Sequence, residues 1–188
     1  MIKLSFIVPV YDVEDYVEQC VKSLCNQTIN DIEIIIVNDG TQDNSIEKIE
    51  KINDDRIKII NQENSGLSSA RNNGLKVAMT KADIIGFLDA DLGSSTKEVE
   101  KIINPILNDE ADVIIAKFPP AKKKGGLGFV KGLAKDSVFE MTGVELDATL
   151  SGQRLFKKEV LEKFDEIPFG YGVEVGMTID ILDRKSVV

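Results

Sequence analysis

The sequence predicts an α/β fold built on a mostly parallel, twisted sheet flanked by helices. Short apolar runs and segments with helical spacing of apolar residues alternate from residue 4 to residue 118. Several of the short runs are rich in β-branched residues, which is typical of buried strands covered on both faces. Alternation of this kind produces right-handed βαβ units. The 188 residues, 43% of them hydrophobic, are enough for one globular domain.

The first half of the chain supplies most of the sheet. We expect strands over residues 4–10, 32–37, 57–60, 84–88 and 113–118. Helices are expected over residues 13–24, 65–79 and 97–107, where apolar residues recur every three or four positions. A further helix begins after Asp43 or Asn44, either of which can cap it, and ends near Ile52.

The second half departs from this alternation after Phe118. Two prolines and a basic, glycine-rich segment predict a loop over residues 119–128. Short helices are expected over 129–134 and around 160–161, a strand over 155–156, a turn over 169–172 and a last helix over 173–181. We therefore treat residues 1–188 as one domain with halves 1–118 and 119–188.

Composition excludes several classes of function. A net charge of −9 disfavours binding to nucleic acid and to anionic membranes, although Lys122 to Lys124 form a local basic run. The sequence contains neither a membrane-spanning apolar stretch nor a signal peptide pattern, so we expect a cytoplasmic protein. Cys20 falls on the apolar side of a helix, which favours a buried thiol over a disulfide with Cys25. The absence of histidine disfavours zinc. A homodimer is left open.

The strongest local signal is Asp89-Ala90-Asp91, which directly follows the apolar run 84–88. In extended backbone the two carboxylates project to the same side and repel each other. A divalent cation relieves that repulsion, and Mg²⁺ typically binds one or two carboxylates together with substrate phosphates. The alternative is a solvated turn, because aspartate is common after strands.

Other functional side chains follow the neighbouring strands. Parallel strands place their carboxyl ends at one edge of the sheet, so Pro9-Val10-Tyr11, Asp39 and Asp89-Ala90-Asp91 should be neighbours. A planar base can stack on Tyr11 and donate a ring N–H to Asp39, while Arg71 adds positive charge near a diphosphate. The alternatives are structural: Tyr11 packs on a helix, Asp39 belongs to a turn, and Arg71 forms a salt bridge. No Gly-x-Gly-x-x-Gly or Walker-type loop is present.

Four segments in this order resemble the family 2 glycosyltransferases of GT-A fold. They are Ser5 to Tyr11, Val37 to Ser45, Asn64 to Asn72 and Asp89 to Asp91. The resemblance implies a nucleotide-diphosphate-sugar donor, usually UDP-linked, a hydroxyl acceptor, and Mg²⁺ or Mn²⁺ as cofactor. It implies that Asp89 and Asp91 contact the metal and that Asp91 is a catalytic residue. The nucleotide-binding residues implied are Pro9, Val10, Tyr11, Asp39, Gly66, Arg71, Asp89 and Ala90.

The segment from Pro168 to Asp180 is similar to the part of glucosyl-3-phosphoglycerate synthases that closes on the donor sugar. Those enzymes are retaining, and the match makes Glu174 a partner for sugar hydroxyls. The acceptor and sugar residues implied are Gly125, Gly126, Gly152, Gln153 and Tyr171. Two departures stand out: the arginine expected after the glycines is Leu127, and the family's metal-binding histidine is absent. Water as third ligand, a truncated chain or weak activity would each explain the missing histidine.

The sequence therefore predicts an enzyme with a nucleotide-binding half, 1–118, and an acceptor- and sugar-binding half, 119–188. A retaining transferase needs no carboxylate nucleophile, whereas an inverting one needs a base facing the acceptor, for which Glu174 is the best candidate. The small phosphorylated acceptor of the retaining relatives is one option. The alternative from another class is a catalytically silent nucleotide-binding module. A nucleotidyltransferase ranks last, because Pro9-Val10-Tyr11-Asp12 stands where a glycine-rich basic loop is needed.

Overall fold

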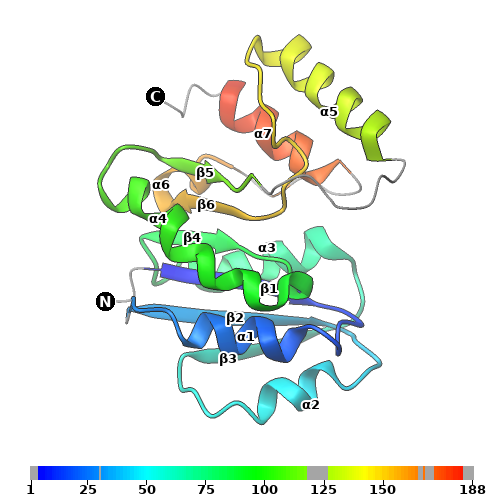
Figure 1. The fold of residues 1–188 in the computed structure, drawn as a ribbon, viewed down its shortest axis with the longest axis vertical. Helices are drawn as coiled ribbons and strands as arrows, with labels where there is room; N and C mark the ends of the chain where they lie inside the picture. The colour runs from blue at the N-terminus through cyan, green and yellow to red at the C-terminus, as the bar shows by residue number, and fades with distance from the viewer. Residues whose placement is uncertain (1–3, 30, 118–126, 165–166, 168–171, 184–188) are drawn as a thin grey trace.

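The fold is a single mixed sheet with helices on both faces (Figure 1). A computed structural model describes residues 4–29, 31–117, 127–164, 167 and 172–183. Within these ranges, six strands are arranged in the order β3-β2-β1-β4-β6-β5. They are β1 (Leu4–Val10), β2 (Ile32–Asp39), β3 (Ile57–Gln62), β4 (Ile84–Phe87), β5 (Val113–Ile115) and β6 (Arg154–Lys157).

The first four strands form the parallel part of the sheet. β1 pairs in parallel with both β2 and β4, and β2 pairs in parallel with β3. β6 lies antiparallel between β4 and β5, with Leu155 opposite both Gly86 and Ile114. β5 consequently runs in the same direction as β4, as a βαβ connection requires, and a strand from the second half is inserted between them. The predicted mostly parallel α/β sheet is confirmed.

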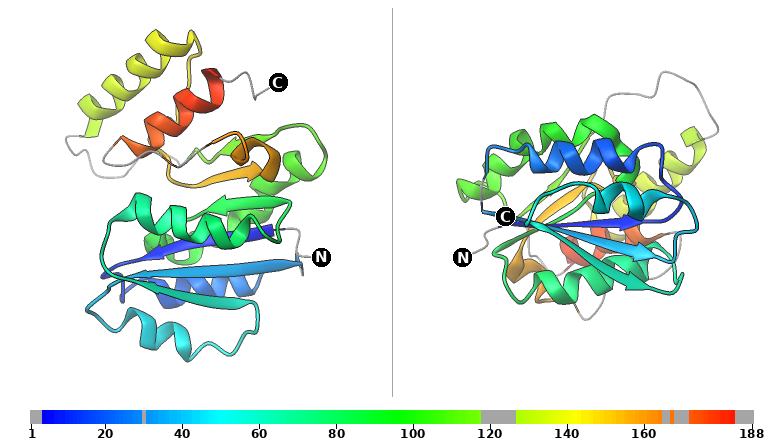
Figure 2. Two further views of the ribbon diagram at one scale, coloured as in Figure 1. Left: turned by 180° about the vertical axis from the view of Figure 1, so that it is seen from behind. Right: turned by 90° about the horizontal axis from the view of Figure 1, so that it is seen from below.

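Two apolar layers sandwich the sheet, because alternate residues of each strand point to opposite faces. Leu4, Phe6, Val8 and Val10 of β1 belong to one core cluster, and Ile7 belongs to the other. The first layer includes α1 (Val17–Cys25), α2 (Ser45–Glu50), η1 (Ala90–Glu98) and α4 (Val99–Leu107). The second includes α3 (Leu67–Ala78), α6 (Lys158–Leu161) and α7 (Val173–Asp183). Figure 2 shows α3 crossing this second face.

The last helix pair extends the fold at the β5 end. α5 (Leu127–Thr142) packs against α7 and lies at the end of the molecule opposite α2 (Figure 1). Ala134 and Val138 are buried, whereas Val130, Leu133 and Met141 are exposed. Among the helices that the structure describes, none combines the length and the apolar character that a membrane-spanning helix needs.

Several predicted boundaries are wrong. The first helix begins at Val17 rather than at residue 13. The helix predicted to begin after Asp43 or Asn44 is α2, which ends at Glu50 rather than near Ile52, and Asp43 accepts a hydrogen bond from the Ser45 N–H at its start. α4 begins at Val99 after the 3₁₀ segment, and β5 ends at Ile115. The predicted helix 129–134 is too short: α5 spans Leu127–Thr142 because it packs on α7, a contact that local spacing does not reveal. In the predicted loop 119–128, residues 127–128 are helical, and residues 119–126 lie outside the described residues.

Candidate functional site

A cleft of about 330 Å³ lies at the carboxyl ends of β1, β2 and β4. Its lining brings together most of the residues that the sequence singled out as nucleotide-binding. The lining residues are Pro9, Val10, Tyr11, Val13, Asp39, Asn64, Gly66, Leu67, Asp89, Ala90 and Asp91. Residues as far apart in the chain as Pro9 and Asp91 meet here because parallel strands end on the same side of the sheet. Among the predicted nucleotide-binding residues, Arg71 is missing from this lining.

Tyr11 presents an exposed aromatic ring at this cleft. Its side chain follows β1 and is 46% exposed, so it is not packed beneath a helix. The next residue, Asp12, has a left-handed φ of 50°, which turns the chain sharply. The Asp12 N–H donates to Thr41 Oγ1 (2.7 Å), and the Gln42 N–H donates to Asp12 Oδ1 (3.1 Å). These bonds between the loops after β1 and β2 hold Tyr11 in place beside Asp39.

Asp39 is buried and organises the loop that leads into α3. Its Oδ1 accepts from Gln62 Nε2 (2.7 Å) and from the Ser65 N–H (2.8 Å), and its Oδ2 accepts from the Gly66 N–H (2.9 Å). Gly66 needs a φ of 85° to present that N–H, a conformation that favours glycine. Asp39 is therefore more than a turn residue. Its Oδ2 keeps acceptor capacity beyond the Gly66 bond.

The two aspartates of the Asp-Ala-Asp segment differ in backbone and in surroundings. Asp89 is extended, with φ −81° and ψ 138°, whereas Ala90 already begins the 3₁₀ segment η1. The expectation that extended backbone would align Asp89 and Asp91 is wrong, because the chain turns into a helix directly after Asp89. Both side chains nevertheless line the same cleft. Their proximity follows from the turn.

Asp89 is held by two donors. Arg71 Nη2 donates to Asp89 Oδ1 (3.1 Å), and Gln153 Nε2 donates to Asp89 Oδ2 (2.5 Å). Both donor side chains are buried, and the Asp89 side chain is 35% exposed. A carboxylate with one donor on each oxygen is fixed in orientation and keeps a second lone pair on each oxygen.

Asp91 is exposed at the cleft, and its carboxyl group responds to Asp89. Partial burial, and then the negative charge of Asp89, raise the pKa of Asp91. The carboxylate oxygens of two neighbouring aspartates are ligands that suit a hard divalent cation. Within the described residues, no group of three or more histidine, cysteine, aspartate or glutamate side chains is placed to hold a metal. A cation at Asp89 and Asp91 would therefore complete its coordination with other oxygen ligands, such as water or the oxygens of a bound molecule.

Arg71 joins the sheet to the start of α7. Arg71 is 1% exposed, and its guanidinium donates from Nη1 to Glu174 Oε1 (2.8 Å) and lies 5.9 Å from the centre of the Phe87 ring. With Asp89 on Nη2, both terminal nitrogens bind carboxylates. The structural salt bridge, weighed above as the alternative to phosphate contact, is thus the arrangement present.

Arg154 is a buried residue that the sequence did not single out. It is 1% exposed and donates to the backbone carbonyls of Ser151 (2.8 Å), Thr149 (3.1 Å) and Glu174 (2.8 Å). Burial lowers the pKa of Arg154 to about 10, against the raising effect of the Glu174 charge. Its only sequence signal is a charged residue at the first position of a short apolar strand.

The acceptor-side residues are described only in part. Gly152 and Gln153 lie beside Arg71 and Asp89, immediately before β6. Gly125, Gly126 and Tyr171 lie outside the described residues. Glu174 lies in the first turn of α7, where a carboxylate also interacts favourably with the helix dipole.

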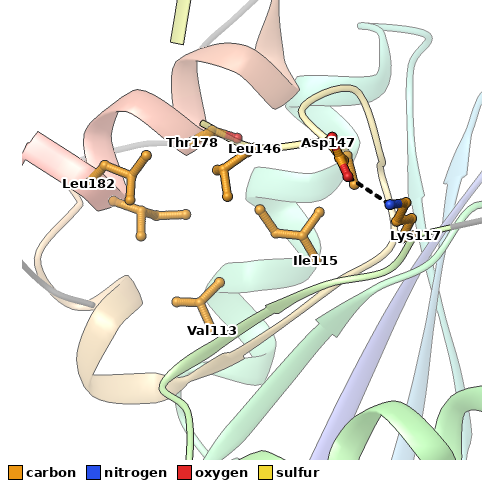
Figure 3. A pocket seen from close by; sticks show the side chains of 9 residues that line it. Val113, Ile115, Lys117, Leu146, Asp147, Thr178 and Leu182 are labelled. Carbon is orange, nitrogen blue, oxygen red and sulfur yellow. Dashed lines mark hydrogen bonds and ion pairs between the residues drawn. The ribbon is translucent and has the colours of Figure 1, made fainter. Parts of the chain in front are cut away.

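A second cavity, of about 310 Å³, lies between β5, the segment 146–148 and α7 (Figure 3). Its walls are mostly apolar and include Val113, Ile115 and Leu182, while Lys117 and Asp147 form an ion pair (2.7 Å) at one side. None of the predicted site residues lines it. It is separate from the cleft.

The solved structures that the chain resembles share its fold. Glucosyl-3-phosphoglycerate synthase from Mycobacterium tuberculosis, in complex with Mn²⁺, uridine diphosphate and phosphoglyceric acid, superposes with a TM-score of 0.76 at 23% identity, covering 97% of this chain and 64% of that one. Residues 1–349 of TarS from Staphylococcus aureus give a TM-score of 0.72 at 22% identity, covering 96% and 55%. At these identities the likeness concerns the fold alone.

Relatives are also found by sequence. The uncharacterized glycosyltransferase EpsJ of Bacillus subtilis is 44% identical over 117 residues, which are 61% of this chain and 33% of EpsJ. The glycosyltransferase GlyA of Streptococcus pneumoniae is 36% identical over 140 residues, which are 73% of this chain and 20% of GlyA. The chain thus matches a third or less of the length of these relatives. The family model for glycosyl transferase family 2 matches residues 5–183, so the chain belongs to glycosyltransferase family 2.

Proposed function

We propose that this chain transfers a sugar from a nucleotide-diphosphate sugar, UDP-linked, to a hydroxyl acceptor, with the help of a divalent cation. The observation that carries the proposal is the single cleft lined by Tyr11, Asp39, Asp89 and Asp91. Two structural neighbours support the donor class: the mycobacterial synthase was crystallised with UDP and Mn²⁺, and TarS with UDP-GlcNAc. Residues 1–118 would form the nucleotide-binding half of one domain, and 119–188 the acceptor half.

The nucleotide base would occupy the part of the cleft between Tyr11 and Asp39. The exposed Tyr11 ring offers a stacking surface, and an offset aromatic stack is worth about 1 kcal/mol beyond the buried area. Asp39 Oδ2 has the capacity to accept a ring N–H in addition to the Gly66 N–H. Pro9 and Val10 would form the apolar floor beneath the base.

The diphosphate would lie next to Asp91 and Asp89. When bound, Mg²⁺ or Mn²⁺ supplies positive charge that offsets the charge developing on the leaving diphosphate. Asp91 would be its exposed protein ligand, and Asp89, fixed by Arg71 and Gln153, would bind it or a ribose hydroxyl. Arg71 would act through the orientation of Asp89, because both of its terminal nitrogens already bind carboxylates.

Glu174 would contact the sugar. Its Oε1 accepts from Arg71, and Oε2 has the capacity to accept from a sugar hydroxyl. A carboxylate engaged by a buried guanidinium is better suited to holding a hydroxyl than to removing its proton, which favours the retaining alternative. NMR of the anomeric product tests this point: an inverted anomer would overturn it.

Calorimetry tests the donor proposal directly. Titration of the chain with UDP should show binding that strengthens when Mn²⁺ is present, and a UDP-sugar should then be consumed in a donor-hydrolysis or transfer assay. Absence of UDP binding with and without Mn²⁺ would overturn the proposal. Binding without any turnover, across a panel of UDP-sugars and hydroxyl acceptors, would instead identify a nucleotide-sugar-binding module.

A further inference from the structure

Within the described residues, the Asp89 carboxylate accepts two hydrogen bonds, and one of them comes from the second half of the chain. Gln153 Nε2 donates to Asp89 Oδ2 at 2.5 Å, and the Gln153 side chain is 6% exposed. The other donor, Arg71, approaches Oδ1 from α3. The orientation of a carboxylate at the end of β4 is therefore set from both sides, by one cation and by one neutral amide.

Gly152 provides the space in which Arg71 and Asp89 meet. A Cβ atom at position 152 would lie 2.6 Å from Arg71 Nη2 and 2.7 Å from Asp89 Oδ2. Distances this short are not tolerated between non-bonded atoms. Because Arg71 is buried and bound on both terminal nitrogens, it has little room to move away. A side chain here would therefore displace Asp89 or Arg71 from its present position.

The segment 151–154 is itself held firmly. The Ala116 N–H donates to the Gln153 carbonyl (2.9 Å), the Ser151 N–H donates to the Ala148 carbonyl (3.1 Å), and Arg154 Nε donates to the Ser151 carbonyl (2.8 Å). The Gln153 amide is therefore presented from a fixed backbone next to β6. Hydrogen-bond partners of a metal-binding carboxylate orient it, and replacing such a partner typically weakens metal affinity about 10- to 100-fold.

We infer that Gly152 and Gln153 are positioning residues for Asp89: Gln153 fixes the carboxylate, and Gly152 keeps the Arg71–Asp89 pair closed. This differs from the direct sugar or acceptor contact that the sequence resemblance implies for them. The inference rests on the proposed function and takes Asp89 as a metal ligand rather than a ribose partner, because it gives the second half of the chain control over the metal–diphosphate side of the cleft. It places no part of Gly152 or Gln153 on the reacting atoms.

The first test replaces the donor. Gln153→Met keeps the length of the side chain and removes the amide, so Asp89 Oδ2 loses its partner. We expect Mn²⁺-dependent UDP binding, measured by calorimetry, to weaken by about 10- to 100-fold, the usual effect of removing a group that orients a metal ligand. UDP binding without metal should be unchanged. Gln153→Glu keeps the size of the side chain but places a second negative charge against Asp89. It should weaken metal-dependent binding at least as much.

The second test fills the space at Gly152. Gly152→Ala should weaken Mn²⁺-dependent UDP binding in the same direction as Gln153→Met, because the added methyl group displaces Asp89 or Arg71. Gly132→Ala is the matched control: a Cβ there meets nothing within 4 Å, and alanine suits the middle of α5. This control should bind UDP and Mn²⁺ like the parent chain.

The outcomes separate the inference from the proposed function. If the parent chain binds no UDP, the proposed function fails. If it does bind UDP with Mn²⁺, and Gln153→Met or Gly152→Ala folds and binds equally well, the inference alone is overturned. An equal loss with and without Mn²⁺ also overturns it, because that pattern indicates direct nucleotide contact or general damage. Tighter metal binding by Gln153→Glu would overturn it by making position 153 a ligand.

Discussion

Arg71 should be among the most important single side chains for stability, and Arg71→Met tests this. Arg71 is 1% exposed, and its guanidinium pairs with Asp89 (3.1 Å) and Glu174 (2.8 Å). Methionine fills similar volume but leaves both carboxylates without their cation. Removing one partner of a buried ion pair typically destabilises a protein by about 3–5 kcal/mol.

The two carboxylates do not share this penalty equally. The Asp89 side chain is 35% exposed, so water hydrates it and reduces its part, whereas the Glu174 side chain is only 15% exposed. Most of the effect therefore comes from Glu174, and we expect a loss near the lower end of the range, about 3 kcal/mol. Domains usually have a free energy of unfolding of about 5–15 kcal/mol, so the variant should still fold.

Urea denaturation of three variants provides the measurement. Arg71→Met should lower the midpoint with little change in m. Adding Glu174→Gln should recover part of the loss, because it removes the buried charge that Arg71 no longer pairs. Lys22→Met is the control, since the Lys22–Glu18 pair is exposed on both sides and is worth at most about 1 kcal/mol. An Arg71→Met effect no larger than that of Lys22→Met would refute this account of the ion pairs.

Three further outcomes are expected. Asp91→Ala should leave the chain folded and abolish the Mn²⁺-dependent part of its thermal stabilisation by UDP. Melting temperatures measured with UDP, in the presence and absence of Mn²⁺, test this, and an unchanged metal response would exclude Asp91 as a ligand. Burial alone would raise the pKa of Asp43, but hydrogen bonds from Ser45 and Thr41 outweigh it and lower the pKa to about 2. The resulting stability, present above the usual value of 3.8, should disappear as the pH falls toward 2, and Asp43→Asn should lack this part of the acid-induced loss in denaturation curves. Burial raises the pKa of Cys20 to about 12, so iodoacetamide at pH 8 should alkylate it only after unfolding, as mass spectrometry would show.

The parallel core of the fold follows from the sequence because its signals are local. A run of four β-branched residues such as Ile34 to Val37 strongly predicts a buried strand. Because parallel strands end at the same edge of the sheet, Tyr11 and Asp91 are predicted to lie at one cleft, as they do. The insertion of β6 between β4 and β5 is a different matter. The residues Leu155 and Phe156 predict a strand but not its direction or the strands beside it, since both depend on the path of the whole second half of the chain.

The polar network beneath the cleft could not be predicted for a related reason. Arg154 carries no pattern that distinguishes a buried arginine from an exposed one, and its partners are backbone carbonyls, which every residue has. The contact of Gln153 with Asp89 joins residues 64 positions apart, on elements whose adjacency was unknown. Spacing along the chain predicts Asp89 as a site residue, but the groups that orient its carboxylate become visible only in three dimensions.

Three aspartates lie around this one cleft, and their surroundings give them different tasks. Asp39 accepts from two backbone N–H groups and a glutamine amide, so its first task is to shape the loop before α3. Asp89 receives a buried cation and a buried amide, which offset its charge and fix its direction. Asp91 faces the cleft, and partial burial of its carboxyl group, followed by the neighbouring Asp89 charge, raises its pKa. A carboxylate whose charge is opposed by its surroundings gains most from an added cation, so a divalent metal in this cleft should depend on Asp91 above the other two.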